Sequence, residues 1–225
     1  MNTYFHLLPA YIDRLMADDN ESYRNRLTLP CPISKEHVDG SRRVGPLHMH
    51  VKHNDHEQMM IWGWIEGYAV HQRMLDEYQR LGLTGYRTAP ATIRFRDGSI
   101  SHDYHEFIVT GWAGVAPPES GIRLERECER CHWKHYSPIL SYEELIDWSQ
   151  WTGDDFFIVW PLPRLILVTE RAAEFLRRWK ENSFRLIRLQ DRDPVVAKSG
   201  FTVGRLSSFL PEDLAIRYGT AIGLE

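Results

Sequence analysis

Two cysteines with two residues between them, Cys128 and Cys131, are the part of this sequence with the most recognisable chemistry. A tight turn can place both sulfur atoms of such a pair on one tetrahedral metal ion, so the pair would supply half of a zinc site. The third cysteine, Cys31, stands between two prolines, with Ser34 where a second turn of this kind would carry its last cysteine. We therefore expect Cys128, Cys131 and Cys31 as candidate zinc ligands.

A histidine would have to complete the tetrahedron. His132 and His135 lie next to the cysteine pair and are the local candidates, while His48 or His50 could reach it from the loop that follows Cys31. Such a closed site would be structural, because four protein ligands leave no position for a reactive water. Two interpretations without a metal remain open. In one, Cys128 and Cys131 are free thiols in a turn; in the other, Cys31 is a small buried residue.

A histidine-rich loop offers a different chemistry. A catalytic metal site needs histidines, a carboxylate and an open position. His56-Glu57 lacks the second histidine of an HExxH motif, because Met60 occupies that place. Solvated loop histidines are the expectation, and no phosphate-binding loop or nucleophile elbow accompanies them. The loop histidines are His48, His50, His53 and His56.

The composition is that of an ordinary globular chain. Of its 225 residues, 43% are hydrophobic and 26% are charged, and the net charge is −4 with neutral histidines. A nucleic-acid partner is therefore not expected. Three cysteines do not make a disulfide framework, no stretch approaches the ~20 apolar residues of a membrane span, and the N-terminus does not resemble a signal peptide. We expect a cytoplasmic protein without a membrane partner.

Two segments of the chain share one order of predicted elements. Strands at 59–62 and 67–70, a helix at 71–81 and a strand at 86–95 are followed by strands at 157–160 and 165–168, a helix at 170–180 and a strand at 184–189. At an offset of 98 residues the two segments share five identities: Trp62/Trp160, Val70/Val168, Arg73/Arg171, Arg80/Arg178 and Arg87/Arg185. We interpret this as an internal duplication.

The predicted fold is α+β, with two related strand–strand–helix–strand units around a common core and an irregular Cys/His-containing loop before each. The first unit, with an N-terminal extension, takes residues 1–100, and the second, with the cysteine pair and a terminal helix, takes residues 101–225; together they should form one compact body. The pattern also predicts a loop at 112–121, a helix from Ser141 to about Trp148 after a capping box, and a helix starting near Pro211.

The chain resembles the double-CXXCG motif family, known mainly from myxobacterial and other proteobacterial genomes. The resemblance covers most of residues 30–190. It departs at two places, because Ser34 replaces one cysteine and His132 replaces the glycine after the second pair. The segments that carry it are Cys31–Ser34, Gly82–Thr88, Ile93–Phe95, Cys128–Cys131 and Val168–Arg171.

This resemblance implies a structural zinc that joins the two halves, and a non-catalytic immunity protein that neutralises a cognate toxin. Trp148 and Trp151, beside Asp147 and Asp154, would be anchors for a basic toxin, because opposed charges raise the association rate and the specificity. A metal-dependent enzyme that uses the histidine loop and a zinc-containing regulatory or adaptor protein are the alternatives. Acids expected on the solvated surface are Asp76, Glu77, Glu143, Glu144, Asp147, Asp154 and Asp155.

Overall fold

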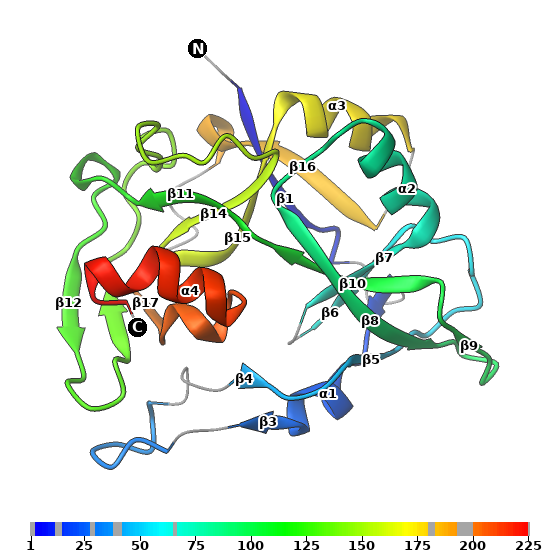
Figure 1. Cartoon of the computed structure of the whole chain (residues 1–225), viewed down its shortest axis with the longest axis horizontal. Helices are drawn as coiled ribbons and strands as arrows, with labels where there is room; N and C mark the ends of the chain where they lie inside the picture. Colours follow the sequence, from blue (N-terminus) through cyan, green and yellow to red (C-terminus); the bar gives the residue numbers. More distant parts are fainter. Residues whose placement is uncertain are drawn as a thin grey trace.

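The computed structural model shows an α+β protein with two main sheets. It describes residues 3–11, 15–27, 30–37, 42–64, 67–179, 183–192 and 200–224. The helices cover the outside of the sheets (Figure 1). They are α1 (Asn20–Arg24), α2 (Gln72–Arg80), α3 (Glu170–Arg178) and α4 (Glu212–Gly219).

The first sheet has five strands, in the order β11 (Gly111–Val115), β14 (Phe156–Trp160), β15 (Leu162–Thr169), β1 (Tyr4–Pro9) and β16 (Phe184–Arg188). The second sheet has seven. Their order is β2 (Met16–Ala17), β6 (Met60–Gly63), β7 (Tyr68–His71), β10 (Tyr104–Val109), β8 (Tyr86–Arg94) and β5 (Leu47–His50), with β9 (Ile100–Ser101) paired to β8.

The two halves of the chain exchange one strand each. Strand β1 runs antiparallel to both β15 and β16, and strand β10 runs antiparallel to both β7 and β8. Beside these, β11 is parallel to β14 and β2 is parallel to β6. Both sheets thus repeat one order and orientation of five strands, and in each sheet one strand comes from the other half. This correspondence supports the interpretation as a duplication, which remains an inference.

Two smaller elements also correspond. A hairpin of β3 (Arg26–Leu27) and β4 (Arg42–Arg43) follows β2, and a hairpin of β12 (Leu124–Glu127) and β13 (Lys134–Tyr136) follows β11. Strand β17 (Phe201–Val203) adds to β13. The chain between the strands of each hairpin carries the cysteines.

Helices α2 and α3 start and end at matching positions of the two halves. His71 caps α2 by accepting a hydrogen bond from the Arg73 amide, and Thr169 caps α3 by accepting one from the Ala172 amide. Just after the end of α2, Gly82 has a φ of +63°, a left-handed conformation that glycine adopts without strain. The apolar face of α2 buries Met74, Leu75 and Tyr78, and that of α3 buries Ala172, Ala173, Phe175 and Leu176.

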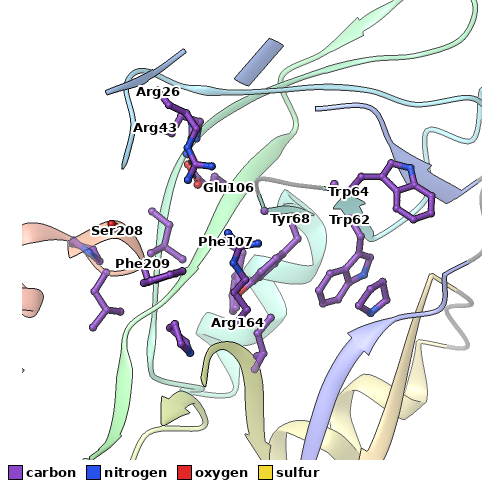
Figure 2. Close-up of a pocket in the computed structure, with 18 of the residues that line it drawn as sticks. Arg26, Arg43, Trp62, Trp64, Tyr68, Glu106, Phe107, Arg164, Ser208 and Phe209 are labelled. Atoms are coloured by element: carbon purple, nitrogen blue, oxygen red, sulfur yellow. Dashed lines mark hydrogen bonds and ion pairs between the residues drawn. The ribbon is translucent and has the colours of Figure 1, made fainter. Parts of the chain in front are cut away.

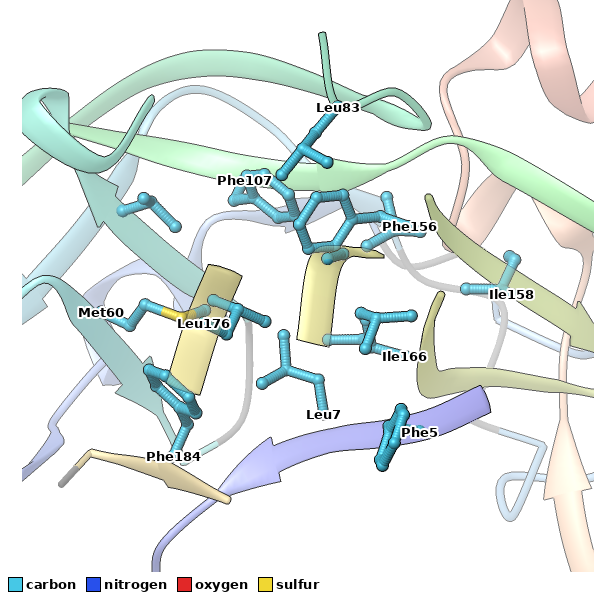
Figure 3. Close-up of a cluster of buried hydrophobic side chains, with 14 of the residues drawn as sticks. Phe5, Leu7, Met60, Leu83, Phe107, Phe156, Ile158, Ile166, Leu176 and Phe184 are labelled. Carbon is cyan, nitrogen blue, oxygen red and sulfur yellow. The ribbon is translucent and has the colours of Figure 1, made fainter. Parts of the chain in front are cut away.

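The core joins both sheets. Phe5 and Leu7 of β1 pack in one cluster with Phe107 of β10 and Phe156 of β14 (Figure 3). Tyr78 of α2 reaches into the same cluster, where ring centroids 5.1–5.8 Å apart are typical of tilted and edge-to-face aromatic pairs. The exchanged strands are therefore held by side-chain packing as well as by backbone hydrogen bonds.

Two predicted elements are wrong. Part of the loop expected at 112–121 is strand β11, which extends to Val115. The helix expected from Ser141 to Trp148 is absent. The Ser141 hydroxyl accepts a hydrogen bond from the Glu144 amide at 3.2 Å, as a capping residue does, but Asp147 accepts hydrogen bonds from the amide and hydroxyl of Ser149 and starts a turn of its own. Such local side-chain bonds compete with helix formation.

Candidate metal centre

The two hairpins bring all three cysteines to one place. Cys31 lies beyond β3, and Cys128 and Cys131 lie in the turn between β12 and β13. In Figure 1 the blue loop beyond β3 lies beneath the tip of the green β12–β13 hairpin. With His37 from that blue loop, these residues form a group whose ligand atoms all lie within 4.8 Å of one another.

The distances within the group match those around a tetrahedral zinc ion. The sulfur atoms of Cys31 and Cys128 are 3.7 Å apart, and Nδ1 of His37 lies 3.3 Å from the sulfur of Cys31 and 3.6 Å from that of Cys131. With Zn–S bonds of about 2.3 Å and Zn–N bonds of about 2.0 Å, tetrahedral angles place sulfurs about 3.8 Å apart and sulfur and nitrogen about 3.5 Å apart. The group can hold a metal ion.

Local structure holds His37 in this position. Its ring stacks on the indole of Trp133, with centroids 4.4 Å apart and planes 10° from parallel. Its amide donates to the carbonyl of Ser34 at 3.4 Å. A ligand ring that is fixed by packing loses little side-chain entropy when it binds a metal.

The turns also direct backbone amides at the sulfurs. The amide of Ile33 donates to the sulfur of Cys31 at 3.4 Å. Burial raises the pKa of Cys31, but amide hydrogen bonds from Ile33 and Ser34, with the contacts to His37 and Cys131, outweigh it and lower the pKa to about 6. Burial and the neighbouring sulfurs raise the pKa of Cys131 to about 11. A bound cation would offset the repulsion among these sulfurs, because metal ligands bind as thiolates.

His132 and His135 are not in the group, which corrects the expected ligand set. Nδ1 of His132 lies 3.5 Å from a carboxylate oxygen of Glu127, and Nδ1 of His135 lies 3.2 Å from one of Glu125. His132 has a φ of +59°, the left-handed conformation that favours glycine, and its amide closes the turn on the carbonyl of Cys128 at 2.9 Å. Glycine would adopt this conformation without strain.

His37 was missed although the sequence contained a signal. It is the first histidine after Cys31, in the same loop, three residues after the serine that replaces a cysteine. Only the fold shows that this loop meets the other hairpin.

In the described part of the chain, the histidines of the histidine-rich loop are not brought together as a metal-binding group. Within the described ranges, the Cys31 group is the only set of three or more metal-binding side chains brought together. His50 faces Glu21 at 3.4 Å, and the ring of His56 packs on Phe95 with centroids 3.8 Å apart. His53 also approaches the Phe95 ring, with centroids 6.2 Å apart, but within the described residues these histidines are not part of a group of three or more metal-binding side chains.

Of the expected partner-binding residues, Trp148 and Trp151 are in contact. Trp148 keeps 44% of its surface exposed and stacks on Tyr4, with centroids 4.0 Å apart. Trp151 is half-buried and meets Trp148 edge-on. Asp147 and Asp154 are both half-buried, and Asp154 accepts a hydrogen bond from the hydroxyl of Thr152 at 2.5 Å.

Asp155 is buried, which corrects its expected place on the solvated surface. Its carboxylate pairs with Arg171 and accepts hydrogen bonds from the Thr169 hydroxyl at 2.7 Å and the Thr84 amide at 3.0 Å. Burial raises the pKa of Asp155, but these bonds lower it more, so the pKa lies below its ordinary value. The network joins α3 to the segment after α2.

Comparison with known proteins adds no relative. No protein-family model matches the chain, and a search of curated proteins finds no match. Among the helices of the described ranges, none combines the length and apolar character needed to cross a membrane.

Proposed function

We propose that this chain is a non-catalytic binding protein of the cytoplasm that neutralises a cognate bacterial toxin, with a zinc ion joining its two halves. The proposal that the protein is non-catalytic is supported by its closed set of four metal-binding side chains, which are Cys31, His37, Cys128 and Cys131. Four protein ligands leave the ion no position for water or substrate, so it would stabilise the fold without taking part in a reaction.

Zinc is the metal that this donor set favours. Three thiolates and one imidazole are soft and borderline ligands, which suit Zn²⁺ and disfavour Mg²⁺ or Ca²⁺. The ligands come from two hairpins in different halves, so the binding free energy of the ion would add to the folding free energy. Without it, three thiols would remain close together at a half-buried place.

The partner class rests on the resemblance to immunity proteins and on one surface. Trp148 projects beside Glu143 and Glu144, and together they line a shallow pocket of about 320 Å³. The stacked contact with Tyr4 fixes the indole, which reduces the entropy lost on binding. An aromatic anchor among carboxylates would suit a basic toxin surface, such as that of a nuclease domain.

Co-expression with a basic nuclease toxin domain encoded next to this gene tests the proposal. The wild-type chain should restore growth and co-purify with the toxin. Trp148→Ala should weaken the complex about 30-fold or more, because anchor residues contribute about 2 kcal/mol or more. Trp64→Ala is the matched control, because this tryptophan is 50% exposed and lies outside the pocket around Trp148. Absence of both protection and a complex would contradict the proposal.

A further inference from the structure

A pocket of about 560 Å³ lies where the two sheets and the first hairpin meet. Strands β6 and β7 contribute Trp62 and Tyr68 to it, β10 contributes Phe107, and β15 contributes Arg164 (Figure 2). Pockets that bind small molecules in proteins have volumes of this order. The candidate zinc ligands and Trp148 are not among the lining residues, so this pocket is a separate place on the molecule.

Trp62 brings a buried hydrogen-bond donor to the pocket. Only 5% of this residue is exposed, and its Nε1 has no hydrogen-bond partner within the described residues. A buried N–H without an acceptor is costly, and such groups in native proteins call for a partner that the chain itself does not supply. Because the indole lines a pocket, a ligand in this pocket is a source of the missing acceptor.

The second half of the chain satisfies the matching N–H internally. Trp160 lies 98 residues after Trp62, in the matching strand β14, and its Nε1 donates to the hydroxyl of Tyr136 at 3.0 Å. Tyr136 belongs to β13 of the second hairpin, whereas the matching strand of the first hairpin, β4, consists of Arg42 and Arg43 and brings no hydroxyl. The two halves therefore differ in the acceptor, and the first half leaves its place to a ligand.

One arginine of the lining is available to an anion. Arg164 is exposed, its guanidinium lies 5.8 Å from the ring centroid of Phe209, and it has no ion pair within the described residues. The other two arginines of the lining have partners in the chain, because Arg43 pairs with Glu106 and Arg26 also has an interaction of its own. The lining thus offers one positive charge, which suits an anion with a single negative charge.

Aromatic rings provide much of the wall. The ring of Tyr68 packs between those of Trp62 and Phe107, with centroids 4.8 Å and 5.9 Å away, and Phe209 also lines the pocket. Burial and the nearby Glu106 raise the pKa of Tyr68, so its hydroxyl stays protonated and uncharged at neutral pH. Walls of this kind favour a planar apolar group.

We propose that this pocket binds a small aromatic carboxylate. A guanidinium holds a carboxylate through two parallel hydrogen bonds, and the single negative charge of the ligand matches the one available arginine, Arg164. The planar ring of the ligand packs among the aromatic side chains, and an oxygen of the ligand accepts the hydrogen bond of Trp62 Nε1. Neither the zinc ion nor a toxin takes part in this binding.

Calorimetric titration of the full chain with benzoate and with 2-naphthoate tests the proposal. The matching amides, benzamide and 2-naphthamide, remove the charge, and cyclohexanecarboxylate keeps the charge but removes the planar ring. At least one of the two acids should bind with a Kd below about 1 mM, and about ten-fold or more tightly than its amide and than cyclohexanecarboxylate. Failure of both acids to bind in this range, or binding of the amides or of cyclohexanecarboxylate as tight as that of the acids, would overturn the proposal.

Two variants locate the binding. Arg164→Gln should weaken binding of the acids about ten-fold or more and leave that of the amides unchanged, because it removes a charged donor from an exposed position. Trp62→Phe keeps a ring but removes the N–H, and it should weaken binding several-fold. Arg178→Gln, at an exposed arginine of α3, is the matched control and should leave the Kd unchanged. Equal effects of the two arginine variants, or an unchanged Kd in folded Trp62→Phe protein, would contradict this placement of the ligand.

Discussion

The sulfur atoms of Cys31 and Cys128 lie 3.7 Å apart, although 97 residues separate them in the chain. The two cysteines belong to two hairpins, one in each half of the chain. Each half also contributes one strand to the main sheet of the other half. A metal ion at this place would therefore tie together halves that are already interlocked. Because the ligands are so far apart in sequence, the ion would also restrict the unfolded chain.

Strand exchange predicts that neither half folds by itself. A fragment of residues 1–100 lacks β10, which lies between β7 and β8, and a fragment of residues 101–225 lacks β1, which lies between β15 and β16. Each fragment should show weak near-ultraviolet circular dichroism alone, and an equimolar mixture should regain the spectrum of the intact chain. Cooperative thermal unfolding of either isolated fragment would show that the exchanged strand is dispensable.

Asp155→Asn should destabilise the protein in a pH-dependent way. The folded-state pKa of Asp155 is lowered, so its stabilising effect is present above the ordinary carboxyl pKa of about 3.9 and is lost as the pH falls through the folded-state pKa. We expect a loss of about 2 kcal/mol at pH 7, because charged hydrogen bonds to Arg171, Thr169 and Thr84 are weakened or removed.

Urea unfolding of wild-type and Asp155→Asn protein from pH 7 to pH 2 measures this difference. The two unfolding free energies should converge at the acid end. Glu174→Gln, an exposed carboxylate of α3, is the control and should change stability little at any pH. A difference that stays constant over the whole range would mean that the ionised carboxylate is not what Asp155 contributes.

Ser34→Cys should restore metal binding to a variant that lacks His37. Ser34 occupies the place of the second cysteine of a turn, and its amide donates a hydrogen bond to the sulfur of Cys31. We expect His37→Ala to lose zinc and the double variant with Ser34→Cys to regain it, measured by competition with a colorimetric chelator. The combination of His37→Ala with Ser34→Ala is the matched control. Zinc binding no stronger in the Ser34→Cys double variant than in this control would show that Ser34 does not face the metal.

Local patterns in the sequence predicted the elements that local forces form. The spacing of Met74, Leu75 and Tyr78 marks one face of α2, and the same face is buried in the structure. The strands that lead into α2 and α3 likewise contain apolar runs, at residues 68–70 and 165–168. The prediction of a helix from Ser141 was wrong. The capping residue that it relied on is present, but Asp147, further along the chain, accepts hydrogen bonds from Ser149 and Gln150 and forms a turn instead.

Long-range contacts could not be predicted in this way. The place of strand β1 between β15 and β16 depends on pairing over more than 150 residues. His37 is a ligand candidate only because its loop meets the other hairpin, and Asp155 is buried in a network with Arg171 and with Thr84, which is 71 residues away in the chain. In each case the residue type gave the chemistry, while the tertiary fold determined the partner.

Metal content of the purified chain, measured by elemental analysis together with two histidine variants, tests the central claim most directly. About one zinc per chain should be present in the wild type and in His132→Gly, which removes a histidine from a left-handed position outside the ligand group. His37→Ala should lose the zinc and unfold at a lower temperature. Absence of zinc from the wild type, its retention in His37→Ala, or its loss in His132→Gly would contradict this account of the site.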